Sequence, residues 1–242
     1  MSAILHCDFT REAPAENLAA DEALLDHCED AGGGGVLRFW EPARNFVVVG
    51  YANRVATEVD PGFCRSAGLP ILRRCSGGGT VVQGPGCLNY ALILPISHSP
   101  QLESVSSTNQ FIMSRIGAAI TPLVGTPVEI KGHTDLALGG IKFAGNAQRR
   151  RRRCLLFHGV LLLDFDLALI EQSLPMPSHQ PDYRANRPHR DFVRNLGLPS
   201  AVVKSALRQA WGAQESLVAL PEDRIESLTR ERYSTDAWNS RF

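Results

Sequence analysis

Two arginines followed by three glycines restrict the folding of this chain more than any other feature. The run RRCSGGGTVV occupies residues 73–82, after the apolar residues 69–72. This order predicts a strand, a tight backbone passage and a second strand. Each glycine loses much backbone entropy on folding, so three in succession are tolerated where φ is positive or where a ligand approaches the backbone closely.

The residues around the glycines indicate an anion-binding pocket. Arg73 and Arg74 carry planar, forked donors that suit a carboxylate or a phosphate. Ser76 adds a hydroxyl, and N–H groups near the glycines can form an anion-binding concavity. A simple hairpin turn or bulge is the alternative. No Gly-Lys-Ser or Gly-Lys-Thr follows and a strand comes next, which argues against a P-loop and a dinucleotide fingerprint.

The length, composition and charge of the chain limit its domain count and its possible partners. The 242 residues fit one large domain or two small ones, and 44% are hydrophobic, which allows a sizeable core. We expect a single domain over residues 1–242, with a core at about 15–175 and a helical C-terminal extension at about 189–242. Basic and acidic residues number 25 each, which argues against nucleic-acid or membrane-surface partners.

The cysteines predict a reducing compartment. None of the six forms a Cys-x-x-Cys pair, so we expect reduced thiols and neither a disulfide framework nor a zinc site. The chain has no long apolar run and no charged-then-apolar leader at its start. These features predict a soluble, cytoplasmic protein.

Hydrophobic periodicity predicts an α+β fold, in which a mostly antiparallel or mixed β-sheet is flanked by helices and a short helical tail follows. The predicted elements are a helix over 15–30, paired strands over 36–40 and 46–51, a Pro-interrupted helix over 55–68, strands over 87–95 and 126–130, a helix over 101–120, a Gly-Gly hairpin over 135–148, a buried strand over 154–164, and helices over 167–173, 189–196, 199–212 and 221–232. Between them, the proline-rich residues 175–188 predict an extended surface crossing.

One lysine is a candidate functional residue. Of the 25 basic residues only three are lysines, at positions 131, 142 and 204. Lys142 lies between Ile141 and Phe143, so on a strand its side chain points away from theirs. A solvent-facing lysine is the usual alternative, but its rarity in this chain favours a pocket role. A compact ammonium suits binding to a carboxylate and phosphate oxygens together.

Several motifs in one order resemble a known family. They are the RRCSGGGTV run, the Leu-Asn-Tyr at 88–90, Asp135, the KFAGNAQ run at 142–148 and the His-Gly at 158–159. This order is similar to that of lipoate–protein ligases and lipoyl or octanoyl transferases, which share a catalytic domain with biotin–protein ligases. The resemblance covers roughly residues 15–170, including a similar opening helix.

The resemblance implies a two-step reaction. In the ligases, ATP and lipoate give lipoyl-AMP and pyrophosphate, and a lysine of a small carrier domain then takes the acyl group. The carrier would be H-protein-like or like the E2 of 2-oxoacid dehydrogenases, and ATP and Mg²⁺ would be needed. Lys142 matches the catalytic lysine, and Asp135 and Asn146 would position the adenylate or Mg²⁺-bound phosphates. The implied substrate-binding residues are Arg73, Arg74, Ser76, Gly77, Gly78, Gly79, Thr80, Asn89, Asp135, Gly145, Asn146 and His158.

Three alternatives stay open within the resemblance. Octanoyltransferases of the family need no ATP and pass the acyl group through a cysteine thioester. Residues 126–148 contain no cysteine, which favours the ligase, while Cys75, Cys87 and Cys154 are outside candidates. A non-catalytic lipoate-binding relative is the second alternative. Biotin ligation is the third and weakest, because the Gly-Arg-Gly-Arg loop is missing.

Two further features bear on partners. Residues 189–242 are shorter than the accessory domain of some ligases, so either this tail suffices, a separate polypeptide supplies that part, or the protein only transfers a preactivated acyl group. Five arginines at 149–153 predict a solvated hairpin end. The alternative is a docking patch for an acidic carrier or a counter-charge for ATP phosphates.

Overall fold

A seven-stranded mixed sheet forms the centre of the molecule. The computed structural model describes residues 3–32 and 34–242, and within them the strand order is β1-β2-β6-β10-β9-β8-β7. β1 and β2 are parallel, and the other neighbours are antiparallel. The strands are β1 (Ile4–Asp8), β2 (Gly35–Trp40), β6 (Cys87–Pro95), β7 (Glu129–Lys131), β8 (Asp135–Leu138), β9 (Ile141–Arg150) and β10 (Cys154–Leu162). The α+β class predicted from the sequence is confirmed.

A smaller, three-stranded sheet carries the glycine-rich run. Its central strand β3 (Phe46–Val49) pairs parallel with β4 (Ile71–Arg73) and antiparallel with β5 (Val81–Gln83). The predicted strand–passage–strand order is therefore confirmed, although β4 and β5 both pair with β3 and not with each other. The two strands are separated by residues 74–80, which hold the three glycines.

The prediction that residues 36–40 pair with residues 46–51 is wrong. β2 belongs to the larger sheet and β3 to the smaller one. The two strands meet through side chains, because Trp40 at the end of β2 stacks on Phe46 at the start of β3 with ring centroids 6.5 Å apart. Every residue of both strands is buried, so alternation could not reveal which strands they pair with.

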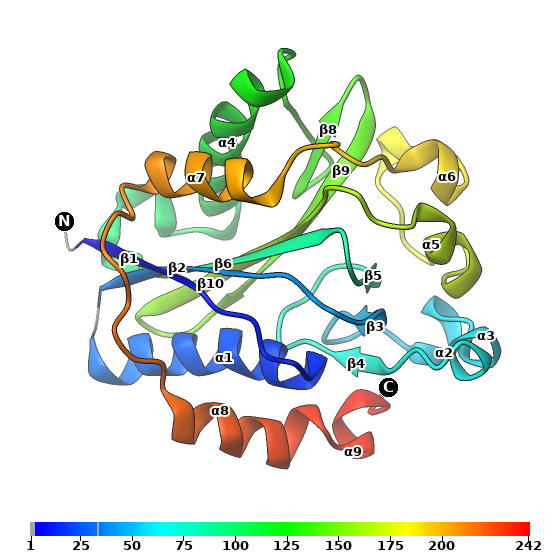
Figure 1. Ribbon diagram of the computed structural model, residues 1–242, viewed down its shortest axis with the longest axis horizontal. Coiled ribbons are helices and arrows are strands. Elements are labelled where there is room, and N and C mark those ends of the chain that lie inside the picture. The colour runs from blue at the N-terminus through cyan, green and yellow to red at the C-terminus, as the bar shows by residue number, and fades with distance from the viewer. Residues whose placement is uncertain (1–2, 33) are drawn as a thin grey trace.

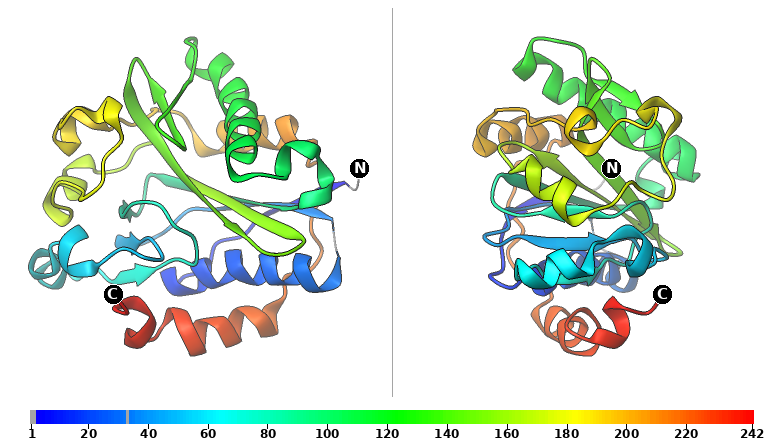
Figure 2. Two further views of the ribbon diagram at one scale, coloured as in Figure 1. Left: turned by 180° about the vertical axis from the view of Figure 1, so that it is seen from behind. Right: turned by 90° about the vertical axis from the view of Figure 1, so that its right-hand side faces the viewer.

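Helices cover both faces of the larger sheet (Figure 1). α4 (Val105–Val124) and α7 (Ser200–Trp211) lie on one face, and α1 (Pro14–Ala31) lies on the other. Figure 2 shows the tail helices α8 (Glu222–Leu228) and α9 (Asp236–Asn239) outside α1, on the side away from α4. The remaining helices, beside the smaller sheet and the end of β10, are α2 (Val55–Glu58), α3 (Pro61–Ser66), α5 (Leu167–Ser173) and α6 (His189–Phe192). Among the described residues, no helix is long and apolar enough to cross a membrane.

The larger sheet is buried on both faces because its central strands are apolar at successive positions. On β6, Leu88, Tyr90 and Leu92 pack toward α4, while Ala91 and Ile93 pack toward α1. Such two-sided burial is typical of a strand that lies between helical layers. A cavity lies on the face of the larger sheet that is turned toward α1 and the smaller sheet.

The predicted Gly-Gly hairpin is confirmed. Gly139 and Gly140 have φ of 57° and 73°, and they join β8 to β9 with Leu138 opposite Ile141. Glycine adopts positive φ values at the least steric cost, so two successive glycines favour this tight turn and the hairpin register that goes with it. The register in turn sets the position of Lys142 on β9.

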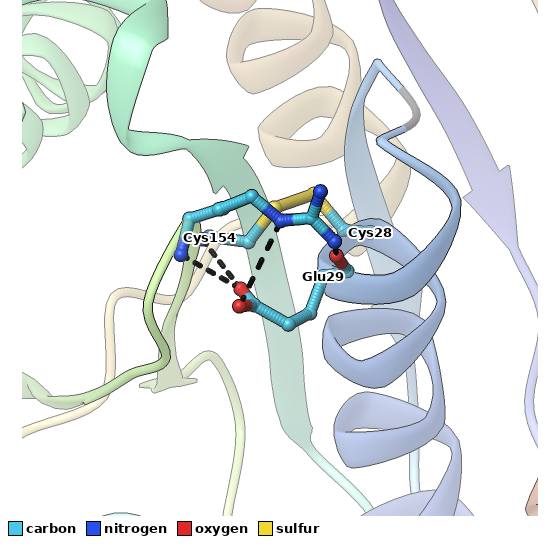
Figure 3. The surroundings of a disulfide bond; sticks show 4 residues. Cys28, Glu29 and Cys154 are labelled. Carbon is cyan, nitrogen blue, oxygen red and sulfur yellow. Dashed lines mark hydrogen bonds and ion pairs between the residues drawn. A yellow bond between two sulfur atoms is a disulfide. The ribbon is translucent and has the colours of Figure 1, made fainter.

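The prediction of six reduced thiols is wrong for one pair. Cys28 in the last turn of α1 and Cys154 at the start of β10 form a disulfide with Cα atoms 6.2 Å apart (Figure 3). Glu29 reinforces the same junction, because its carboxylate accepts hydrogen bonds from the backbone N–H groups of Arg153 and Cys154, each at 2.9 Å. The partners are 126 residues apart in sequence, so their proximity is a property of the tertiary structure alone.

The arginine run forms the hairpin end between β9 and β10, as predicted. Several of its side chains, however, bind to other parts of the protein and not only to solvent. Arg150 donates to the hydroxyl of Thr108 and to the carbonyl of Leu102. Arg151 pairs with Glu22 and Asp26 on α1. Arg152 is exposed. The hairpin is thus fastened to helices on both faces of the sheet, which the prediction of a solvated end missed.

Candidate functional site

A cavity of about 760 Å³ lies between the two sheets. Its wall combines strands β6, β9 and β10 of the larger sheet, the glycine-rich loop and β5 of the smaller sheet, and α1. Residues 174–192, here called the covering segment, contribute Pro175, His179, Tyr183 and Arg184. The predicted site residues that line the cavity are Arg74, Gly78, Gly79, Thr80, Asn89, Asp135, Lys142, Gly145, Asn146 and His158.

Lys142 and the glycine run line the same cavity, as the sequence predicted. The ammonium of Lys142 lies 2.7 Å from Asp135 Oδ1, and the two side chains are 24% and 13% exposed. A Cβ atom on Gly145 would lie 2.9 Å from Lys142 Nζ, so a larger residue at this point of β9 would displace the ammonium from its place beside Asp135. The main chain of the lysine is held as well, because Lys142 O accepts a hydrogen bond from Arg194 N at 2.8 Å.

Residues 76–79, here called the glycine loop, fold around the guanidinium of Arg74. Its Nη2 donates to the carbonyls of Gly77 and Gly79, both at 2.6 Å. Gly78 has φ of 85°, and a Cβ there would lie 2.9 Å from Arg74 Nη2. Burial lowers the pKa of Arg74 to about 10, which leaves it charged at neutral pH. Arg74 therefore shapes the loop by using its donors on loop carbonyls.

Three residues of the predicted set do not line the cavity. They are Arg73, Ser76 and Gly77. The side chain of Arg73 is fully buried and points away from it. Its guanidinium donates to the carbonyls of Gly50, Tyr51, Asn53, Trp238 and Asn239. Trp238 Nε1 donates in return to Arg73 O at 2.8 Å, so the C-terminal tail fastens the start of the glycine loop from behind.

A buried polar chain links the glycine loop to α1. Ser76 Oγ is 2.6 Å from His158 Nε2, and His158 Nδ1 is 3.2 Å from Asp21 Oδ2. Arg38 donates to Asp21 Oδ1 at 2.5 Å, which orients the carboxylate. Although the order resembles a catalytic triad, Ser76 is 1% exposed and lies behind the cavity wall. These hydrogen-bonded side chains hold His158 in the cavity wall and connect the glycine loop to the larger sheet.

Asn146 is fixed by its neighbours on the same sheet. Its Nδ2 donates to Thr134 O at 2.8 Å, and Tyr90 OH donates to its Oδ1. A Cβ atom on Gly159 would lie 1.8 Å from Asn146 Oδ1, so glycine is required opposite it on β10. Asn89, on β6, has a buried Nδ2 without a hydrogen-bond partner among the described residues. Asn89 lines the cavity, and its amide Nδ2 is not used by another described residue.

Sequence reasoning missed the contribution of the covering segment. The expected surface crossing at 175–188 is exposed on one side but lines the cavity on the other. Tyr183 OH donates to Asp135 Oδ2 at 2.7 Å, and Ser178 donates to Glu58 across the cavity edge. The histidine, tyrosine and arginine residues between the prolines could have indicated a role in a site, because polar and aromatic side chains in loops often serve binding or catalysis.

No cysteine lines the cavity among the described residues. Burial raises the pKa of Cys75 and of Cys87 to about 12, so both are protonated at neutral pH. Cys154 is held in the disulfide. None of the three outside candidates therefore has the position or the ionisation of a nucleophile.

Comparison with known proteins assigns the family. Residues 13–203 match the model of the lipoyl protein ligase A/B catalytic domain. The chain belongs to this family. An octanoyltransferase LipM from Carboxydothermus hydrogenoformans is 28% identical, covering 98% of this chain and 97% of its own. A lipoate-protein ligase A subunit 1 from Thermoplasma acidophilum is also 28% identical, covering 92% and 90%.

Several solved structures share the fold of this protein. A lipoate-protein ligase A bound with ATP superposes with a TM-score of 0.84 at 22% identity and covers 99% of this chain and 98% of its own. The ligase of a bi-partite Thermoplasma acidophilum system, described with its E2 lipoyl domain, gives a TM-score of 0.81 at 21% identity, over 99% and 96%. The high TM-scores establish that this chain has the same fold. At such low identities they do not identify its substrates, which must be inferred from the residues of its own cavity.

The described part of this chain offers no ready-made metal site. Among residues 3–32 and 34–242, no three His, Cys, Asp or Glu side chains come together as a metal site. Both oxygens of Asp135 already have partners, Lys142 and Tyr183. A divalent cation would therefore have to enter with phosphate oxygens as its main ligands, which is the usual way that Mg²⁺ binds with nucleotides.

Proposed function

We propose that this protein is an ATP-dependent lipoate–protein ligase. The carboxylate of lipoate would attack the α-phosphorus of ATP, giving lipoyl-AMP and pyrophosphate. The amine of a carrier lysine would then attack the acyl carbonyl and release AMP. The observation that carries the proposal is the Lys142 ammonium in a cavity that it shares with the glycine loop and with no cysteine of the described residues.

The residues suggest a division of labour within the cavity. Lys142 would hold the lipoate carboxylate and later the carbonyl oxygen and α-phosphate, where negative charge develops. The bare backbone of Gly78 and Gly79 would let the acyl-adenylate approach closely. Leu18, Trp40 and Val48, which also line the cavity, would contact the hydrocarbon part of the substrate. Mg²⁺ would accompany the nucleotide and neutralise its phosphate charge.

The acceptor would be a lysine on a lipoyl carrier domain. One neighbour in fold is described together with an E2 lipoyl domain, as part of a bi-partite ligase. A relative over most of this chain is named subunit 1 of a lipoate-protein ligase. These two comparisons support a carrier domain as partner and a separate polypeptide as an accessory subunit.

The second candidate is an ATP-independent octanoyltransferase. It is favoured by the relative named octanoyltransferase LipM, which matches almost the whole chain at 28% identity. This route needs a cysteine that forms a thioester, and the buried, protonated Cys75 and Cys87 supply none. The raised pKa values of these thiols therefore weigh toward the ligase.

One experiment separates the two candidates. The protein is mixed with a lipoyl domain and either lipoate with Mg-ATP, lipoate alone, or octanoyl carrier protein, and the products are weighed by intact mass. The ligase should lipoylate the domain only with ATP and release pyrophosphate in step with lipoate. A thioester adduct on the protein, or acyl transfer without ATP, would overturn the ligase assignment.

A further inference from the structure

A tyrosine of the covering segment touches the pair that holds the cavity lysine. Tyr183 OH donates to Asp135 Oδ2 at 2.7 Å, and Asp135 Oδ1 lies 2.7 Å from Lys142 Nζ. Each carboxylate oxygen thus has one partner, the hydroxyl on one side and the ammonium on the other. A carboxylate bound at both oxygens cannot rotate without breaking one of these contacts.

The backbone is shaped to bring Tyr183 to this place. Gly132, in the turn between β7 and β8, has φ of 55°, and a Cβ there would lie 3.1 Å from Pro181 and 3.5 Å from the Tyr183 ring. The ring packs against Phe192 with centroids 5.2 Å apart. Arg187 ties the segment to the β8–β9 turn through the carbonyls of Gly140 and Tyr183. The hydroxyl is therefore held at Asp135 by the packing of its ring on Phe192 and by the bonds of Arg187.

The hydroxyl remains a donor at every physiological pH. Burial first, and then the negative charge of Asp135, raise the pKa of Tyr183 far above its ordinary value. The two residues that follow the covering segment contact the backbone of the lysine, since Arg194 N donates to Lys142 O and Val193 forms a β-bridge with Lys142. Both the backbone and the ammonium of Lys142 are thus set by residues 183–194.

We propose that Tyr183 is a positioning residue that fixes Lys142 by holding Asp135. Tyr183 acts through the carboxylate and makes no bond to the reacting atoms. Its effect on turnover rests on the proposed ligase function, whereas its effect on the lysine does not. The two parts are tested separately.

Lysine reactivity tests the contact without any assumption about activity. The chain has only three lysines, Lys131, Lys142 and Lys204, so competitive labelling with light and heavy acetyl-N-hydroxysuccinimide, read by peptide mass, resolves the amine of each one. In Tyr183→Phe, Lys142 should react roughly threefold or more faster, because its carboxylate partner is less firmly held. Lys204, paired with Asp8 and Glu41 away from the cavity, should not change. Unchanged or slower labelling of Lys142 would overturn the proposal.

A double-mutant cycle tests the consequence for the reaction. In Tyr183→Phe, the rate constant for lipoyl-AMP formation should fall roughly tenfold, with the KM for lipoate changed less than about twofold. In an Asp135→Asn background, the same substitution should cause no further loss, because the group it acts through is gone. Equal losses in both backgrounds would mean that Tyr183 only supports the fold and would refute the proposal.

Controls separate this outcome from other failures. Tyr51→Phe removes a hydroxyl that makes no hydrogen bond among the described residues and should match the parent protein in labelling and in rate. Thermal unfolding of each variant reports any general loss of stability. If the parent protein forms no lipoyl-AMP, the ligase assignment fails, while the labelling result still decides whether Tyr183 holds the Asp135–Lys142 pair.

Discussion

Two cationic regions lie at or behind the cavity wall, and their side chains make different kinds of contact. At the glycine loop, Arg73 and Arg74 direct their donors at backbone carbonyls and hold the chain in shape. On β9, Lys142 lines the cavity, and its ammonium pairs with the carboxylate of Asp135, whose side chain is 13% exposed. Arg74 shapes the glycine loop in the cavity wall and Arg73 anchors the chain behind it, whereas the ammonium of Lys142 lines the cavity itself.

The difference follows from the two side chains. A guanidinium has five donors in a fixed plane and loses little by burial when carbonyls surround it, so it suits a structural junction. An ammonium is a compact charge whose partners can be exchanged, so it suits a substrate that changes its charge distribution during the reaction. This contrast can be tested, since substitutions in the two regions should affect different quantities.

Lys142→Ala should have the largest effect, and on turnover alone. By analogy with the removal of one preorganised donor, lipoyl-AMP formation should fall on the order of 10²- to 10³-fold. The midpoint of urea unfolding should move little, because the lysine is partly exposed. The matched control is Lys131→Ala, on the edge strand β7. Near-normal turnover in Lys142→Ala would remove the distinction between the two regions.

Arg73→Met should have the next largest effect, on stability. The substitution keeps most of the volume but leaves buried carbonyls of two segments without donors, so the free energy of unfolding should fall by about 3 kcal/mol. Urea unfolding measures this value, and Arg65→Met on the exposed face of α3 is the control. A stable variant with lost lipoate binding would instead place Arg73 among the substrate-binding residues.

Gly78→Ala separates loop shape from loop flexibility. Gly78 has a positive φ and little space beside Arg74, whereas Gly77 has neither restriction. We therefore expect Gly78→Ala to cost about 1–2 kcal/mol of stability and to weaken lipoate binding, and Gly77→Ala to cost less than about 0.5 kcal/mol. Thermal unfolding and calorimetric titration with lipoate measure both effects. Equal behaviour of the two variants would contradict a loop shaped by Arg74.

Ser76→Ala should have the smallest effect. It removes the partner of His158 Nε2 and should lower the free energy of unfolding by about 1 kcal/mol, without abolishing turnover. The control is Ser66→Ala, which removes an exposed hydrogen bond from the Ser66 hydroxyl to the carbonyl of Phe63 within α3. Complete loss of acyl transfer in Ser76→Ala, with a stable fold, would make Ser76 a reacting group after all.

Local patterns predicted the backbone well. The Gly-Gly turn, the strand over 154–164 and the helix over 15–30 each depend on neighbours within a few positions, through positive φ, alternation or helical spacing. The pairing of residues 36–40 with 46–51 failed because strands buried on both faces carry no alternation that identifies a partner.

The sequence by itself determined which segments form strands, turns and helices, that a rare lysine follows a tight hairpin, and the motif order of the lipoyl ligase family. Only the tertiary structure decided that Arg73 faces the tail, that Cys28 meets Cys154, and that Tyr183 reaches Asp135. The physical reason is range. Backbone conformation depends on adjacent residues, whereas the partner of a buried donor, thiol or carboxylate depends on how distant segments pack together.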